Sequence, residues 1–91
     1  MRIDHPGVML QKLFVEPLDV TLTEVADALG VSVSSVSRVI SGKSSISSEM
    51  ALRISHVFGG DPETWVSLQW QYDLELAKSK IDLSQLKVLN P

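Results

Sequence analysis

Residues 21–42 read TLTEVADALGVSVSSVSRVISG, and this stretch contains the strongest helix signals of the chain. Thr21 and Glu24 have the spacing of a capping box, which marks the start of a helix. Gly30 favours the end of this helix, and Ser32 can cap a second helix. Gly42 favours the end of that second helix. The stretch therefore predicts two short helices joined by a tight turn.

Small and branched residues in this stretch fit a steep crossing of the two helices. A helix-turn-helix needs a small residue where the helices touch, a glycine in the turn and branched apolar residues beneath the second helix. Ala26, Gly30 and Val36 meet these demands. A DNA-binding helix-turn-helix lays the outer face of its second helix in the major groove. Here that outer face consists of Ser34, Ser35, Ser37, Arg38 and Ser41.

The charge of this stretch differs from that of the whole chain. Eight Lys and Arg against eleven Asp and Glu give a net charge of −3, which excludes a polybasic nucleic-acid binder of general affinity. Arg38 and Lys43 are nevertheless the only charged residues between Asp27 and Glu49, among nine serines. Hydroxyls and backbone N–H groups at helix starts can bind phosphate oxygens. The alternative is that the serines only cap helices and solvate the surface, with Arg38 as a cation of no consequence.

Apolar residues also recur at helical spacing outside this stretch, and no alternating strand pattern appears. A first helix is predicted to begin at Pro6 and to stop before Pro17. Its inward-facing residues are expected to be Leu10, Leu13 and Phe14.

Two more helices are predicted after the helix-turn-helix. One is capped by Ser47 or Ser48 and ends at Gly59, and its inward-facing residues are expected to be Met50, Ala51, Ile54 and Val57. The other has Asp61 as its cap and Pro62 as its first residue, and runs to about Ala77. Ninety-one residues allow one compact unit. We therefore expect an all-α, five-helix domain at residues 1–80 that carries DNA binding and dimerisation, followed by a short tail at 81–91.

The last helix carries two apolar stripes. Trp65, Leu68, Tyr72 and Leu76 can serve the core. The second stripe is predicted to form a dimer interface, because aromatic anchors dominate interface energetics and dimerisation doubles the few cations available for DNA. Its residues are Val66, Trp70, Leu74 and Ala77. The alternative is that Trp70 lies beneath the tail, covered by Leu83, Leu86 and Leu89.

Several classes of protein are excluded by what the chain lacks. It has no cysteine, which removes disulfides, thiolate zinc sites and cysteine nucleophiles. His5 and His56 lie far apart in the sequence. His5 is interpreted as a residue that flanks the first helix, and His56 as a polar position on the fourth helix. Phosphate-loop, nucleophile-elbow and dinucleotide motifs are missing, as is any apolar stretch that would span a membrane. We expect a cytoplasmic protein that is not an enzyme and has no cofactor, metal or membrane partner.

The sequence also resembles the HigA-type antitoxins, also called VapI-like, which fall within the lambda-repressor and Cro class of helix-turn-helix proteins. The resemblance extends from His5 to about Ala77. Its most specific part is PETW at 62–65, followed by LQ at 68–69 and YDL at 72–74.

The resemblance implies a five-helix domain that forms a homodimer and binds a palindromic operator in its own promoter as an autorepressor. It also implies a partner, a HigB-type (RelE-like) toxin that cleaves mRNA and is neutralised by the antitoxin. Such a toxin is basic, which suits the net charge of −3. Carried over by position, the DNA-facing residues are Thr23, Ser32, Ser34, Ser35, Ser37 and Arg38, with Lys43 and Ser44 near the DNA backbone.

Two other functions stay open. Serines occupy most of the positions at which such proteins often carry Asn, Thr or further Arg. One alternative is a solitary helix-turn-helix transcriptional regulator without a toxin. The other is a protein-interaction module that binds a basic partner and hardly touches DNA.

Overall fold

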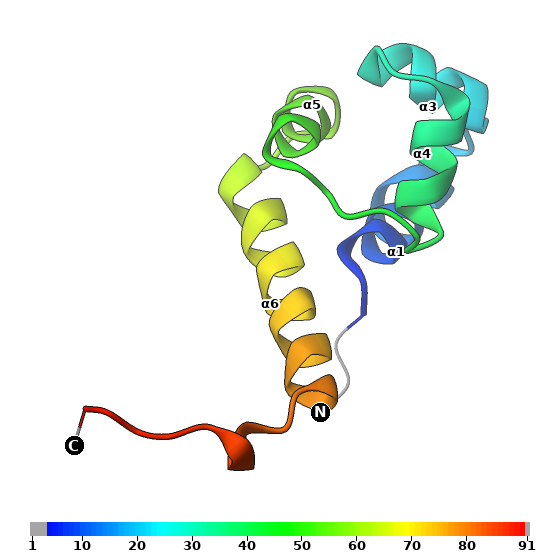
Figure 1. Cartoon of the computed structure of the whole chain (residues 1–91). Helices are drawn as coiled ribbons and strands as arrows, with labels where there is room; N and C mark the ends of the chain where they lie inside the picture. The colour runs from blue at the N-terminus through cyan, green and yellow to red at the C-terminus, as the bar shows by residue number, and fades with distance from the viewer. Residues whose placement is uncertain (1–3, 91) are drawn as a thin grey trace.

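The structure, a computed structural model, describes residues 4–90 (Figure 1). Its first helix is a continuous run of three segments, α1 (Pro6–Leu10), the π-helical η1 (Gln11–Val15) and α2 (Glu16–Leu18). The later elements are α3 (Leu22–Leu29), α4 (Val33–Ile40), α5 (Ser48–Phe58), α6 (Pro62–Lys80) and the 3-10 turn η2 (Leu83–Gln85). With the first run counted as one helix, the described residues form five helices and no strand. The all-α, five-helix fold is confirmed.

The first helix passes through Pro17, so the prediction that it stops before this proline is wrong. A proline inside an α-helix clashes with the carbonyl group four residues earlier and lacks the N–H that the helix needs. Directly before it, the Glu16 N–H donates to the Gln11 carbonyl oxygen, which makes a wider turn than an α-helix has. This wider turn gives the proline ring room. Asp19, in the left-handed conformation at φ 53°, then ends the helix.

The caps around the helix-turn-helix are confirmed. The Glu24 N–H donates to Thr21 Oγ1 at 3.1 Å, and the Glu24 carboxylate accepts from the Thr21 N–H at 3.4 Å. Gly30 ends α3 in the left-handed conformation at φ 71°. The Ser35 N–H donates to Ser32 Oγ at 3.1 Å at the start of α4. Local sequence is therefore enough to fix both ends of the turn.

The two later helices also begin as predicted. The Met50 N–H donates to Ser47 Oγ at 3.1 Å, so Ser47 is the cap of α5. Asp61 occupies the cap position of α6, although its side chain makes no capping hydrogen bond. The helix continues to Lys80 rather than ending near Ala77.

The core joins the helix-turn-helix to the first helix, α5 and α6. Its buried apolar residues are Leu10, Val15, Val25, Ala26, Leu29, Val36, Val39, Ile46, Ala51, Ile54 and Trp65. The ring of Phe14 meets Trp65 edge-on, with 5.7 Å between the ring centroids. Phe14 packs against the core as predicted, but Leu13 is 61% exposed, so its predicted inward orientation is wrong. The π-helical turn changes the residue period and buries Val15 instead. Val57 was also expected inward and is exposed near the end of α5.

Gly7, in the first turn of α1, determines how closely α1 approaches α4. A β-carbon at this position would overlap the carbonyl oxygen of Val39. Only glycine therefore allows this backbone contact, which fixes α4 against the first helix.

The C-terminal tail leaves the helical body in an extended direction (Figure 1). Ile81 is extended, and Asp82 accepts the Ser84 N–H at 3.0 Å in the short turn that follows. Trp70 stays 62% exposed, so the alternative in which it lies beneath the tail is wrong. With the tail, the chain measures 52 × 22 × 20 Å. Across residues 4–90, no helix combines the length and apolar character that crossing a membrane requires.

Candidate nucleic-acid interface

The outer face of α4 is polar and accessible. Val36 and Val39 are buried on its inner side. Ser34, Ser37 and Arg38 are exposed on the outside, and Ser35 is half-buried. This separation follows from helical periodicity, since residues three and four positions apart share a face. The outer face contains no acidic residue.

A cluster of hydroxyl groups lies at the start of α4. Ser32 Oγ donates to Ser35 Oγ at 2.8 Å and lies 3.2 Å from Ser34 Oγ. The N–H groups of Val33 and Ser34 stand in the first turn, where an α-helix offers no internal acceptor. The positive end of the helix dipole is also here. The geometry suits an anion such as a phosphate group.

Backbone hydrogen bonds at the other end of α4 bring the main chains of Arg38 and Lys43, the two cationic residues of this region, together. The carbonyl oxygen of Arg38 accepts from the N–H groups of Lys43 at 2.9 Å and Ser44 at 3.0 Å, and from the Ser41 hydroxyl at 3.2 Å. The chain therefore folds back, so that Lys43 and Ser44 stay beside the last turn of the helix. Within residues 4–90, neither cation forms an ion pair with an acidic side chain.

The predicted DNA-facing residues thus fall into two groups on α4 and its flanks, with one residue on the neighbouring helix. Ser32, Ser34 and Ser35 contact one another at the start of α4, and Arg38, Lys43 and Ser44 lie together at its end. Ser37 is exposed between the groups. Thr23 is exposed on α3, which the tight turn holds against α4. None of the eight is in the core.

Arg53 anchors the helix-turn-helix from α5, a role that the sequence reading missed. Its Nη1 donates to the carbonyl oxygens of Leu29 at 2.8 Å and Gly30 at 3.3 Å. Its Nη2 contacts Glu49 Oε1 at 2.9 Å. These bonds satisfy carbonyl groups at the end of α3 that have no partner inside the helix. The spacing of Glu49 and Arg53, four residues apart, was the only signal in the sequence.

Gln69 is a second supporting residue that the sequence reading missed, because it lies on a helix face assigned by apolar residues alone. It is 5% exposed, and its Oε1 accepts the Ile46 N–H at 2.8 Å. Its Nε2 donates to Asp73 Oδ1 at 2.9 Å. The side chain therefore ties α6 to the loop that follows Lys43 and Ser44.

His5 lies beneath the same loop. Its position before the first helix was predicted, but its burial was not. Its Nδ1 accepts the Gly7 N–H at 2.9 Å, and its ring meets Tyr72 edge-on with 4.9 Å between centroids. Burial lowers the pKa of His5 below its ordinary value of 6.5, against the opposing effects of Asp73 and a backbone hydrogen bond at Ser44. Among residues 4–90, no three His, Cys, Asp or Glu side chains are grouped as metal ligands.

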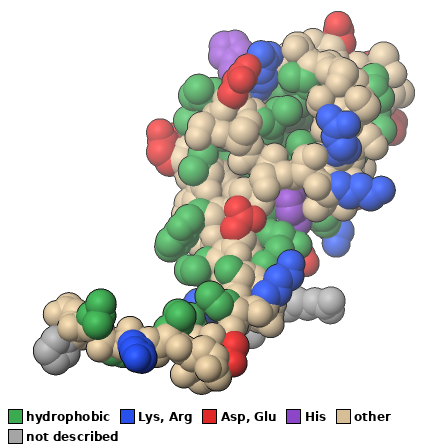
Figure 2. Space-filling model, in the orientation of Figure 1, with side chains coloured by type: hydrophobic (Ala, Val, Ile, Leu, Met, Phe, Trp, Pro, Cys, Tyr) green, Lys and Arg blue, Asp and Glu red, His purple; other side chains and the backbone are tan. Residues whose placement is uncertain are grey.

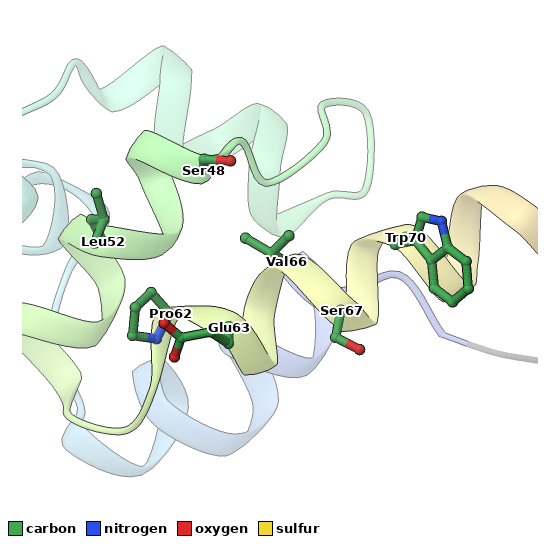
Figure 3. A pocket seen from close by; sticks show the side chains of 7 residues that line it. All are labelled: Ser48, Leu52, Pro62, Glu63, Val66, Ser67 and Trp70. Atoms are coloured by element: carbon green, nitrogen blue, oxygen red, sulfur yellow. The ribbon is translucent and has the colours of Figure 1, made fainter.

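The predicted dimer stripe is exposed on α6. Val66 and Leu74 are each 39% exposed, and Ala77 is also exposed. Beside the stripe, α5 and α6 form an open groove of about 520 Å³ (Figure 3). Its lining residues are Ser48, Leu52, Pro62, Glu63, Val66, Ser67 and Trp70. Figure 2 shows hydrophobic side chains along this flank of the body and Lys and Arg side chains along the opposite one.

Known proteins have sequences related to this chain. YddM of Escherichia coli K12, described as an uncharacterised helix-turn-helix transcriptional regulator, is 37% identical over 85 residues, covering 93% of this chain and 89% of its own. Virulence-associated protein I of Dichelobacter nodosus is 31% identical over 87 residues, covering 96% and 79% of the two chains.

Solved structures agree closely with the fold. The antitoxin GraA superposes with a TM-score of 0.92 at 30% identity, covering 98% of this chain and 99% of its own. GraA in complex with its operator gives a TM-score of 0.90 at 30% identity, covering 100% and 95%. The Pseudomonas aeruginosa antitoxin HigA with the higBA promoter superposes with a TM-score of 0.87 at 29% identity. The match covers 98% of this chain and 100% of the HigA chain.

The family model described as helix-turn-helix (HTH_3) matches residues 11–65, more than half of the chain. That match includes both helices of the turn and the anchoring residue Arg53. The chain belongs to the HTH_3 helix-turn-helix family, in the branch that includes the HigA-type and VapI-like proteins.

Proposed function

We propose that this chain is a dimeric antitoxin that binds its own operator DNA as an autorepressor and neutralises a RelE-like, mRNA-cleaving toxin. The observation that carries the DNA-binding part is the outer face of α4. This face is exposed and free of acids, and it ends in Arg38 and Lys43, which lie close together. The operator complexes of GraA and of HigA, which share this fold, support the assignment.

The phosphate contacts come from two chemically different ends of α4. At the start, backbone N–H groups and Ser32 offer hydrogen bonds with the helix dipole behind them. At the end, Arg38 and Lys43 supply the charge. Thr23, Ser34, Ser35, Ser37 and Ser44 complete the surface. Serine hydroxyls both donate and accept, so they position the protein on DNA more than they select bases.

A homodimer is part of the proposal, because two cations per chain neutralise few phosphates and affinity follows the number neutralised. The interface is assigned to Val66, Trp70, Leu74 and Ala77 on α6. These side chains are exposed and belong to a different helix from the predicted DNA-facing residues, and in this proposal α4 of each copy stays open to DNA.

Binding to DNA is tested by fluorescence anisotropy with a duplex of the gene's own upstream region at several salt concentrations. Arg38→Ala removes one cation from each subunit. The slope of log affinity against log salt should therefore fall by about 2, and the affinity should fall with it. Lys12→Ala is the control, since Lys12 is exposed but lies outside the predicted surface. An unchanged slope for Arg38→Ala would contradict the proposal.

The toxin is the second part of the proposal and has its own test. A toxin that binds and cleaves RNA is basic, and the net charge of −3 complements such a partner. A small basic protein is expected in the neighbouring reading frame. Its expression should arrest growth, and co-expression of this chain should restore growth.

One observation favours a second function, a solitary transcriptional regulator. YddM, which matches over most of both chains, is described as a regulator and not as an antitoxin. The two functions predict the same DNA surface. They differ in the neighbouring gene, because a solitary regulator has no small basic protein beside it.

A further inference from the structure

The groove between α5 and α6 is an apolar surface that no other segment of residues 4–90 covers. Leu52 is 61% exposed on its α5 side, and Pro62 and Val66 form the α6 side (Figure 3). It continues into the exposed stripe through Trp70, which lines both. A continuous apolar patch of this kind marks a contact site more often than a surface facing water.

The C-terminal tail is the second apolar surface without a partner. Lys80 ends α6, and the ten residues at 81–90 are all exposed. Five of them are apolar: Ile81, Leu83, Leu86, Val88 and Leu89. The apolar side chains of the tail and the apolar lining of the groove are therefore both available for packing.

The charges of α6 indicate how two copies align. Its first turn contains Glu63, with Asp61 just before it, and its last turn contains Lys78 and Lys80. An antiparallel pair of these helices places the acidic end of each against the basic end of the other, whereas a parallel pair would oppose like charges. Trp70 lies near the middle of the helix. A twofold axis at this residue aligns the exposed stripe with itself.

We propose that two copies pair α6 antiparallel about Trp70, and that each tail crosses to fill the groove of the partner subunit. The inference rests on the proposed homodimer and adds its register and a tail exchange. At 1.5 Å per residue, Lys80 of the partner subunit lies ~15 Å from the axis, and Pro62 lies ~12 Å from it. The partner's tail therefore emerges at the mouth of the groove and continues toward Leu52.

A second copy fits the groove better than the chain's own tail. To reach its own groove, the tail would have to reverse direction and return along ~27 Å of α6 from Lys80 to Pro62. The extended backbone at Ile81 leads away from the helix instead (Figure 1). Lys87 in the tail also carries a charge opposite to that of Glu63 at the groove.

Paired cysteines test the exchange, because the chain contains none of its own. Leu52→Cys is combined with Leu83→Cys or with Leu86→Cys, and the doubly substituted chain is oxidised under native conditions at micromolar concentration. The control combines Leu13→Cys with the same tail variants. Leu13 is as exposed as Leu52, at 61%, but lies outside the groove. All four positions are on the surface, so folding should be preserved.

The expected product is a covalent dimer, enriched at least about tenfold over the control, since groove and tail meet at a millimolar effective concentration within the dimer. An intrachain disulfide, seen as a fast-migrating monomer, would show that each tail fills its own groove and would overturn the proposal. A yield equal to that of the control would overturn it as well.

Sedimentation of the unsubstituted chain separates failure of the exchange from failure of the dimer. A dimer without the crosslink leaves the proposed homodimer intact and refutes the tail exchange alone. A monomer at 100-fold the concentration that saturates operator DNA refutes both. Removal of residues 81–91 gives a further measure, and the dissociation constant of the dimer should then rise by about tenfold or more.

Discussion

The guanidinium group of Arg53 on α5 donates a 2.8 Å hydrogen bond to the carbonyl oxygen of Leu29, the last residue of α3. It thereby links the turn of the helix-turn-helix to the rest of the core. Gly30 is part of this link, because a β-carbon there would lie 3.0 Å from Arg53 Nη1. The angle between α3 and α4 is thus supported by a third helix.

Replacement of this arginine should destabilise the fold. Arg53→Met keeps much of the aliphatic length but leaves the Leu29 carbonyl unpaired, so the free energy of unfolding should fall by about 1–3 kcal/mol. Glu49→Gln is the control, because it removes only an exposed ion pair, worth roughly 0–1 kcal/mol. Urea titrations measure both variants. Equal losses would show that the ion pair and not the carbonyl contact stabilises the turn.

A methyl group at Gly7 should also destabilise the fold. Gly7→Ala would push α1 away from the Val39 carbonyl, at a cost of about 1–3 kcal/mol or more. The substitution also disturbs the hydrogen bond from the Gly7 N–H to His5 Nδ1, which caps the start of α1. Thermal unfolding followed by circular dichroism measures the loss. An unchanged midpoint would mean that the two helices can separate freely at this contact.

The amide of Gln69 should matter for both stability and DNA binding. Gln69→Met leaves the Ile46 N–H buried without an acceptor, which should cost about 1–3 kcal/mol. The loop with Lys43 and Ser44 loses its support, so operator affinity should fall too. Gln71→Met is the matched control on the exposed side of α6, with a change within about 0.5 kcal/mol. Urea unfolding and fluorescence anisotropy report the two effects separately.

Stability should depend on pH through His5. Burial lowers the pKa of this imidazole in the folded chain, while the unfolded chain keeps a value of about 6.5. Below that pH the unfolded chain takes up a proton that the folded chain resists. The free energy of unfolding should therefore be constant above the unfolded-state pKa and fall as the pH decreases toward the folded-state pKa.

Urea titrations at a series of pH values, from neutral pH downward through the folded-state pKa of His5, measure this change in the free energy of unfolding. His5→Gln should remove this drop, whereas His56→Gln, at an exposed position, should retain it. A drop that persists in His5→Gln would show that His5 is not its source.

An acid placed on the outer face of α4 should reduce operator binding. Ser37→Asp sets a negative charge against phosphate groups at each of two half-sites, with about 1 kcal/mol of repulsion each, so affinity should fall at least about tenfold. Ser37→Ala lacks the charge and is the matched control. Both are compared by anisotropy on the same duplex. Equal affinity of the two variants would place Ser37 away from DNA.

The helices around the turn could be predicted from the amino-acid sequence, because their signals are local. Thr21, Ser32 and Ser47 act on backbone groups within three residues, and Gly30 acts through its own φ angle. Apolar periodicity then separated the buried side of α4 from its exposed side. The outer face of the candidate site could be predicted for the same reason.

The support of that site by distant segments became visible in the folded chain alone. Pro17 reads as a helix stop, yet a π-helical turn accommodates it. The burial of Gln69 had no signal in the sequence, since its amide accepts from the N–H of Ile46, which is 23 residues away. Trp70 was compatible with cover by the tail, and the backbone direction at Ile81 decided against it. Capping and periodicity depend on neighbours in the chain, whereas burial of a polar group or exposure of an apolar one depends on which segments meet in space.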